Sequence, residues 1–117
     1  MAIYLGLDIG TTNLGVVAWE AESDRLLASI TSPNTAARGI VDGRAELDLG
    51  ALRVIAAAAL GQAVAALADR AGQVRAVGVT GQQHGLALLG PNAEPLGPAI
   101  TWQDRRVLEP MPGKTHT

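Results

Sequence analysis

Three short β-rich runs lie close together at the start of the chain, at residues 3–9, 14–19 and 26–31. The stretches between them are polar turns of only a few residues. Connections this short join antiparallel neighbours, because a parallel crossover needs a dozen or more residues. The sequence therefore predicts an antiparallel meander. Its first run is apolar on both alternations except for Asp8, which is typical of a central strand covered on both faces.

A long helix is predicted for residues 49–71. Alanine, the residue with the best helix propensity, fills much of this segment. Larger apolar side chains fall on one stripe at helical spacing, namely Leu52, Ile55, Leu60, Val64 and Leu67. Asp48 is expected to cap the first turn, and Gly72 is expected to end the helix. The many small residues predict close packing against a sheet or another helix.

A further strand is predicted at residues 74–80, directly after the helix. A strand that follows a helix in this way usually returns parallel to an earlier strand. Residues 32–50, ahead of the helix, are read as a polar loop with a short extended piece. A β run is expected at 86–89 and an irregular or edge segment at 95–102, where prolines limit pairing. The order of these elements predicts a mixed α/β protein.

Composition limits the function classes. A chain of 117 residues forms one domain or part of one. The formal net charge of -2 argues against a basic nucleic-acid binder. The absence of cysteine excludes disulfide scaffolds, zinc–cysteine sites and thiol catalysis. The longest uninterrupted apolar stretch, residues 54–60, is short, so no membrane span is expected, and the N-terminus does not read as a signal peptide.

The first candidate site follows the first predicted strand. Asp8 stands at the end of that strand, and the turn after it contains Gly10, Thr11, Thr12 and Asn13. Free backbone N–H groups in such a turn can cradle phosphate oxygens, and a carboxylate suits a magnesium ion. The alternative is a polar hairpin turn in which Asp8 accepts hydrogen bonds from the turn itself.

Two better-known phosphate-binding motifs do not fit this chain. The P-loop ends in Gly-Lys-Ser/Thr, as residues 113–115 do, but its required first glycine falls on Leu108. The dinucleotide-binding fingerprint needs three glycines at a fixed spacing after the first strand, and Gly6 and Gly10 do not match that spacing.

The second candidate site is the polar loop after the strand at 74–80, with Gln82, Gln83 and His84 between two glycines. Amides and imidazole can donate and accept hydrogen bonds, as a hydroxyl-rich ligand requires. The alternative is an ordinary polar loop with a surface histidine. A metal-binding role for His84 is disfavoured, because the only other histidine, His116, lies near the end of the chain.

The third candidate site contains Trp102 and Asp104 within the polar segment that follows residue 100. An indole face offers an apolar wall for the carbon side of a sugar, and the polar neighbours suit its hydroxyl groups. The alternative is an exposed loop anchored by one tryptophan, with an Asp–Arg surface pair that contributes little.

The three sites together resemble the FGGY family of carbohydrate kinases. The resemblance rests on LDIGTT at residues 7–12, GVTGQQHG at 78–85 and PAITWQDRR at 98–106, in this order and at the expected separations. It is closest to the xylulokinase and sedoheptulokinase branch. Gln83 stands where methionine is usual in that branch, and Arg105 stands where glycine is common, which puts the identity of the sugar in doubt.

The resemblance implies an RNase H-like (actin-like ATPase) fold and ATP-dependent phosphorylation of a ketose such as a pentulose or heptulose, in the cytoplasm. Asp8 would hold Mg²⁺, the turn at 10–13 would contact the phosphates of ATP, and the sugar would meet Gln82, Gln83, His84, Trp102 and Asp104. No nucleic acid or membrane partner is expected.

The chain is shorter than the complete enzymes of the family that it resembles. Family members are several times longer, and their catalytic-base aspartate and adenine site lie in segments that have no counterpart in residues 1–117. We therefore expect a partial N-terminal domain that is inactive alone and that self-associates through uncovered apolar surface. The alternatives are a sugar-binding half-domain without catalysis and a fragment of another kinase of the actin-like ATPase superfamily.

Overall fold

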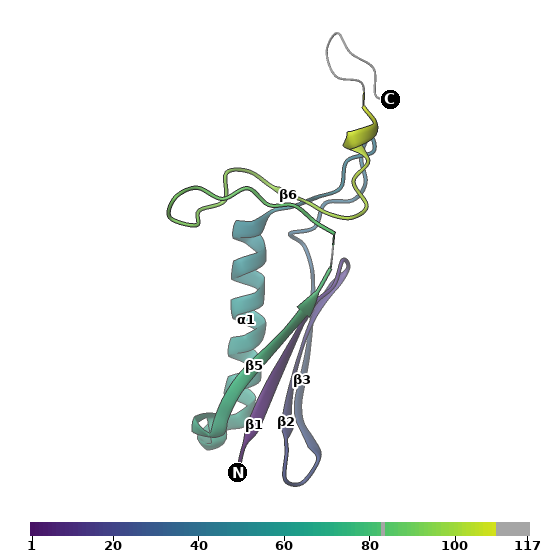
Figure 1. Ribbon diagram of the computed structural model, residues 1–117. Helices are drawn as coiled ribbons and strands as arrows, with labels where there is room; N and C mark the ends of the chain where they lie inside the picture. The colour runs from purple at the N-terminus through teal and green to yellow at the C-terminus, as the bar shows by residue number, and fades with distance from the viewer. Residues whose placement is uncertain (83, 110–117) are drawn as a thin grey trace.

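The computed structural model describes residues 1–82 and 84–109. Strands β1 (Ile3–Ile9), β2 (Asn13–Glu20) and β3 (Arg25–Pro33) form the predicted antiparallel meander. Strand β5 (Val74–Gly81) pairs parallel with β1, so the sheet order is β3-β2-β1-β5. β1 is therefore central, as predicted, and Figure 1 shows the four strands side by side with the helix along one face.

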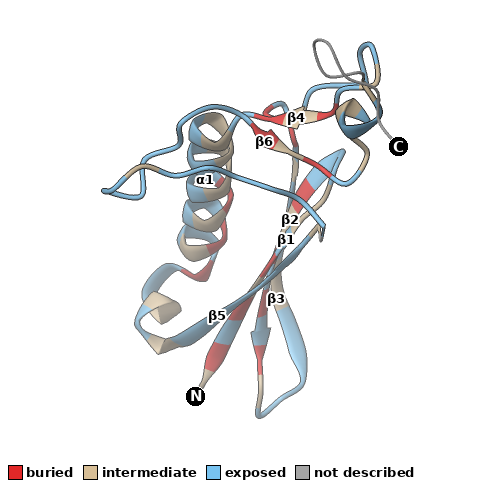
Figure 2. Cartoon of the chain, turned by 45° about the horizontal axis from the view of Figure 1, so that its top comes forward, coloured by how far each residue is buried: buried red, intermediate tan, exposed pale blue. Residues whose placement is uncertain are grey.

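Helix α1 (Leu49–Leu67) covers one face of this sheet. Alternate side chains of β1 and β2 supply most of the core. Leu5, Leu7 and Val16 are buried beneath the helix together with its residues Ala59 and Ala63. The predicted stripe of larger apolar residues lies on the same side of the helix and packs against these clusters. Figure 2 shows the buried residues concentrated between α1 and the strands.

The opposite face of the sheet has no helix over it among the described residues. Tyr4 and Trp19 lie on it as an exposed aromatic pair with ring centroids 6.2 Å apart, and Asp8 is exposed as well. The expectation that β1 is covered on both faces is therefore wrong for the part of the chain that the structure describes. On the helix side of the sheet, Val77 and Val79 of β5 pair with Leu5 and Leu7 but are exposed, because α1 lies over β1, β2 and β3.

The helix ends four residues earlier than predicted. Ala68 adopts a left-handed φ of 52°, its backbone N–H donates to Ala65 O, and the chain continues as the 3-10 helix η1 (Ala68–Gln73). In η1, Arg70 forms an ion pair with the buried Glu20 of β2. Gly72 lies inside η1 and does not terminate α1, so that prediction is wrong. Asp48 caps the helix as predicted.

By length and composition, the helical segment Leu49–Gln73 is apolar enough to cross a membrane. The expectation of no membrane span considered only uninterrupted apolar stretches and not an alanine-rich helix, and it stays a prediction. The same test is passed by the mostly buried core helices of soluble proteins; α1 packs one face on the sheet and exposes the other among the described residues.

A smaller two-stranded sheet lies beyond the N-terminal end of α1. It pairs β4 (Glu46–Leu47) with β6 (Ala99–Ile100), which are the short extended pieces expected in the loops around them. The strand predicted at 86–89 is absent from the described residues. Only isolated bridges form there, and residues 85–98 make an arm that projects over α1 (Figure 1). The 3-10 helix η2 (Arg106–Leu108) follows.

Candidate functional site

The turn between β1 and β2 is closed by its own backbone. Gly10 N donates to Asn13 O at 2.9 Å, and a Cβ atom at Gly10 would lie only 2.7 Å from the same oxygen. A glycine is therefore required at this position by the close approach of the backbone. The backbone N–H groups of Thr11 and Thr12 donate to no other described residue. The turn thus offers two unused amide donors beside two exposed hydroxyl side chains.

Asp8 points to the uncovered face of the sheet. It pairs with Gly15 of β2 and Thr80 of β5, and with Gly6 and Gly78 these residues line a shallow cavity of about 550 Å³. The glycines leave space around the carboxylate. No hydrogen bond to the Asp8 side chain is formed within the described residues, so the alternative in which it caps its own turn finds no support.

A second cavity of about 480 Å³ lies at the carboxyl end of β5, against the other face. Residues of the second and third sequence motifs meet in it, because backbone hydrogen bonds of 2.9 and 2.8 Å join Leu86 to Ile100 of β6. Its polar lining includes Thr80, Gln82 and His84, and Trp102 supplies an aromatic wall. Gln83 lies outside the described residues. Val79 and Thr80 line both cavities, so the two lie on opposite faces of the same end of β5.

Two polar residues that line the second cavity, Gln82 and His84, have uncommon features. Gln82 Oε1 is buried and has no hydrogen-bond partner among the described residues. An unpaired buried acceptor costs free energy, so such groups call for an explanation, and a ligand hydroxyl is one. His84 holds a left-handed φ of 60°, a conformation that is uncommon outside glycine and that collects at functional sites. Trp102 is 57% exposed.

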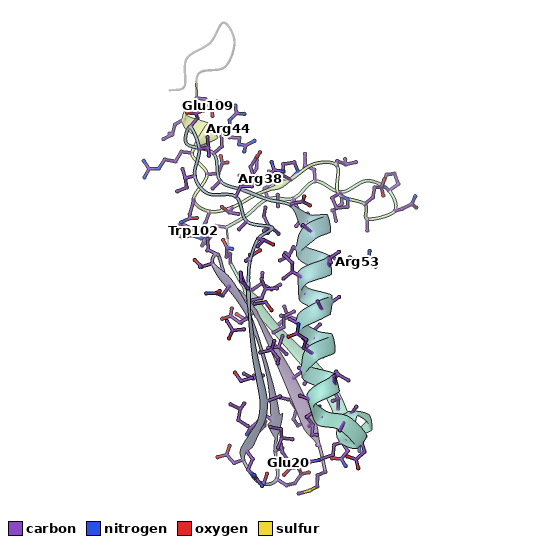
Figure 3. All side chains as sticks on the ribbon, turned by 180° about the vertical axis from the view of Figure 1, so that it is seen from behind. Glu20, Arg38, Arg44, Arg53, Trp102 and Glu109 are labelled. Carbon is purple, nitrogen blue, oxygen red and sulfur yellow. The ribbon has the colours of Figure 1, made fainter. Side chains whose placement is uncertain are left out.

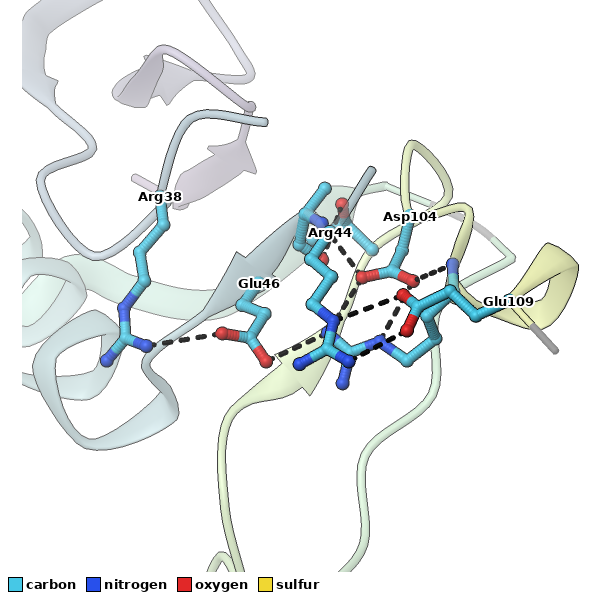
Figure 4. Close-up of polar contacts among 8 residues, drawn as sticks. Arg38, Arg44, Glu46, Asp104 and Glu109 are labelled. Carbon is cyan, nitrogen blue, oxygen red and sulfur yellow. Dashed lines mark hydrogen bonds and ion pairs between the residues drawn. The ribbon is translucent and has the colours of Figure 1, made fainter. Parts of the chain in front are cut away.

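Asp104, in contrast, does not line this cavity. Its carboxylate accepts hydrogen bonds from Ala45 N at 2.8 Å and from Arg106 Nε and Nη2 at 3.0 and 2.8 Å (Figure 4). The Asp104 side chain is 2% exposed. The Arg106 guanidinium holds the pKa of this carboxyl well below its usual range. The structure thus directs the Asp104 oxygens into protein contacts. The Asp–Arg pair predicted as an alternative is present, with a buried carboxylate and a partly exposed guanidinium.

Arg106 continues these contacts to β4. Its Nη2 atom donates to Glu46 Oε2 at 2.8 Å, and Glu46 Oε1 pairs with Arg38 at 3.3 Å. Hydrogen bonding to Arg106 lowers the pKa of Glu46. We call the contacts among Asp104, Arg106, Glu46 and Ala45 the loop clasp, because they fasten the loop that bears Trp102 to β4. Figure 3 shows Trp102 at the end of the sheet opposite Glu20.

Comparison with known families decides the identity of this domain. Residues 3–112 match the N-terminal domain of the FGGY family of carbohydrate kinases. The chain belongs to the FGGY family. This removes the alternative of a fragment from another kinase of the actin-like ATPase superfamily.

Xylulose kinases are among the relatives of this FGGY chain. It is 33% identical over 107 residues to the xylulose kinase of Streptomyces coelicolor, covering 89% of the chain and 20% of that protein. Among solved structures, a xyloylose kinase from Brucella ovis superposes with a TM-score of 0.79 at 26% identity, over 89% of this chain and 22% of that one. The xylulose kinase of Rhodospirillum rubrum gives 0.77 at 27% identity, over 89% and 21%.

These neighbours confirm the predicted fold class, since the FGGY sugar kinases have the actin-like ATPase fold and this chain forms part of one such domain. The chain spans about a fifth of the length of the curated relatives it matches.

The contacts that fasten the loops of this FGGY domain were not predicted from its sequence. Glu46 and Arg106 lie 60 positions apart, and Asn34 contacts the turn after β1 across 24 positions. Asn34 directly follows β3, just as Gln82 directly follows β5. The position of a polar residue at a strand end, which indicated Gln82, could therefore have indicated Asn34 as well. Of the charged residues of the clasp, Asp104 and Arg106 lie in the third motif, and Glu46 carried no local signal.

Proposed function

We propose that this chain is the opening part of an ATP-dependent kinase that phosphorylates a neutral ketose, a pentulose or a heptulose. The observation that carries the proposal is the cavity in which Gln82, His84 and Trp102 meet, directly beside the strand end that leads to the turn after β1. In parallel sheets, ligands bind outside the carboxyl ends of the strands. β1 and β5 are parallel neighbours, so the sugar and the phosphates would approach the same edge of the sheet.

In this proposal the turn after β1 binds the phosphates of ATP. The unused N–H groups of Thr11 and Thr12 and the close backbone approach at Gly10 form a concave donor surface that suits phosphate oxygens. Asn13 is assigned as a further contact. Binding by backbone donors fixes the position of the phosphates and offsets their charge, and positioning and charge stabilisation account for most catalysis of phosphoryl transfer.

Asp8 is proposed as the magnesium ligand. The described residues contain no cluster of three or more His, Cys, Asp or Glu side chains, so this part of the chain forms no protein cage for a metal. Mg²⁺ is usually held by one or two carboxylates together with substrate phosphates, and Asp8 is a free carboxylate next to the turn. The ion, when bound, would neutralise charge that develops on the phosphates.

The sugar would lie in the second cavity. Gln82 and His84 would exchange hydrogen bonds with its hydroxyl groups, with Gln83 assigned a similar role, and the Trp102 ring would pack on its carbon face. No Lys, Arg, Asp or Glu side chain lines this cavity among the described residues, which favours an uncharged substrate. We assign Asp104 to holding the loop in place and not to contact with the sugar, because its oxygens are occupied.

The remainder of the kinase would supply the catalytic base and the adenine site, so we propose that the isolated chain turns over no ATP. We also propose a cytoplasmic location, which the lack of cysteine fits.

Sugar binding by the isolated chain tests the cavity directly. Two-dimensional ¹H–¹⁵N NMR resolves the two indole N–H signals, and D-xylulose is expected to shift that of Trp102 and not that of Trp19. Gln82→Ala should weaken the response, and Gln62→Ala, an exposed helix position, should not. An unperturbed Trp102 signal at saturating sugar would argue against the assignment.

Activity is tested in a chimera, with this chain in place of the matching segment of the Streptomyces coelicolor xylulose kinase. ATP turnover is expected only when a pentulose or heptulose is present. Turnover by the isolated chain would instead overturn its assignment as an incomplete enzyme. Sugar binding without any activity in the chimera would favour the alternative of a non-catalytic sugar-binding half-domain.

We further propose that the isolated chain self-associates through the apolar side chains of β5 and α1 that no described residue covers, among them Val54, Val77 and Val79. Analytical ultracentrifugation should show concentration-dependent association. A monodisperse monomer with a cooperative thermal transition would contradict this.

A further inference from the structure

Asn34 lies directly behind the turn that joins β1 and β2. It follows the last residue of β3 and is only 6% exposed. Two of its donors reach the turn, since Asn34 Nδ2 donates to Gly10 O at 2.8 Å and Asn34 N donates to Thr12 O at 2.8 Å. A single buried residue therefore ties down two carbonyl oxygens of the candidate phosphate-binding turn.

The orientation of the Asn34 amide is fixed from its other side. Asn34 Oδ1 accepts a hydrogen bond from Ala36 N at 3.2 Å, so the NH₂ group must face Gly10. Ala36 O in turn accepts from Asp48 N, the N-cap of α1, at 3.0 Å. The Asn34 side chain is thus oriented by the segment that leads to the start of the helix.

The direction of these carbonyl groups matters for an anion. A carbonyl oxygen carries partial negative charge and repels phosphate, whereas an N–H group attracts it. Both tied carbonyls, at Gly10 and Thr12, point to Asn34, and the N–H groups of Thr11 and Thr12 are left without a partner among the described residues. Donors without protein partners are free for a ligand.

We propose that Asn34 is a positioning residue that turns the carbonyl groups of the 10–13 turn away from the phosphates of the nucleotide and leaves its N–H groups for them. The proposal rests on the phosphate role given to this turn above. It needs an amide at position 34: a carboxylate would keep the shape and the contact with Ala36 but would replace attraction of Gly10 O by repulsion.

The test compares Asn34→Asp with Asn34→Ala. If Asn34 only fills space, Asn34→Asp should behave like the wild-type chain and Asn34→Ala should be worse. If the donor to Gly10 matters, Asn34→Asp should be at least as damaging as Asn34→Ala. Asn92→Asp, in an exposed turn, makes the same change of net charge and is the matched control.

Two readouts are taken by ¹H–¹⁵N NMR on the 117-residue chain. The first is the chemical shift and exchange of the amides of Gly10, Thr11 and Thr12. The second is their response to inorganic pyrophosphate, whose affinity is expected to fall about tenfold in both Asn34 variants, as for the loss of about 1.4 kcal/mol. The indole signal of Trp19 reports whether the sheet is still folded. If Asn34→Asp does not fold, Asn34→Leu, which keeps a similar side-chain volume without a hydrogen-bond donor, takes its place in the comparison.

Unchanged turn signals and an unchanged pyrophosphate response in the folded Asn34 variants would overturn the proposal. A different result would show that the proposed function has failed and not only the role of Asn34. If the wild-type turn ignores pyrophosphate, the phosphate role of the turn fails, and the role of Asn34 in binding fails with it, although loss of the Asn34 contacts would still move the turn amides.

Discussion

Replacing Asp48 tests how far α1 depends on its first turn. Asp48 Oδ1 accepts from Ala51 N at 3.0 Å, and the first turn of the helix contains no acidic residue that offers a substitute. Loss of a side-chain N-cap costs about 1 kcal/mol of unfolding free energy. A chain of 117 residues has an unfolding entropy of about 0.25 kcal/mol/K, so Asp48→Ala should lower Tm by about 4 °C.

Asp48→Asn separates the hydrogen bond from the charge. Asparagine caps as well as aspartate, so this variant should lose only the interaction of the carboxylate with the helix dipole, about 0.3–1 kcal/mol at low salt. Thermal unfolding followed by circular dichroism measures both variants under the same conditions. An unchanged Tm in Asp48→Ala would refute the reasoning, because it would mean that packing of Leu52 and the residues after it holds the first turn without a cap.

Three further predictions concern the helix and the loop clasp. Gly61→Ala should stabilise the chain by about 0.5–1 kcal/mol and raise Tm by about 2–4 °C, because position 61 is inside α1 and a Cβ there meets nothing within 4 Å; a lower Tm would contradict this. Asp104→Asn should shift or broaden the indole signal of Trp102 and leave that of Trp19 unchanged; two unchanged signals would speak against a clasp that positions the loop. The folded chain lowers the pKa of the Asp104 and Glu46 carboxyls, so the unfolded chain binds more protons in acid, and urea unfolding should show stability falling below about pH 4.3; a flat profile down to about pH 3 would exclude this contribution.

The first half of the fold could be predicted because its signals are local. Alternation of side chains and turn residues gave β1 with its observed bounds and β2 and β3 to within two residues. The end of α1 could not be predicted in the same way. Ala68, a residue with no preference for a left-handed conformation, ends the helix, and the more obvious Gly72 does not. The contact of Arg70 with Glu20 accompanies this turn and is not visible in the local sequence.

A strand at residues 86–89 was predicted from apolar character alone. Strand formation also requires a partner along its length, and here the chain finds only single bridges, from Leu86 to Ile100 and from Leu89 to Pro95. Pro95 and Pro98 lie in the opposing segment and cannot donate ladder hydrogen bonds. The prolines therefore limit strand pairing in residues 86–89 as well as in their own segment.

For the candidate site, the motif order predicted which loops meet but not what each side chain contacts. Gln82, His84 and Trp102 do line one cavity. Asp104 lies two residues from Trp102 in sequence, yet its carboxylate contacts Ala45, 59 positions away. Contacts over such distances depend on how β4 and β6 pair, and the sequence pattern of neither two-residue strand indicates that pairing.

β1 is the first strand to be synthesised, but it is the last to gain both of its neighbours in the sheet. β1 receives one partner from β2 at once, but its other edge waits for β5, whose final residue is Gly81. At a synthesis rate of about 5–20 residues per second, the stretch from the end of β2 to the end of β5 takes about 3–12 s to translate. During that interval one edge of β1 has unpaired backbone groups and can pair with a wrong strand. Misfolding of this domain during its synthesis on the ribosome should therefore arise at the edge of β1 that later pairs with β5, the strand that lines both cavities.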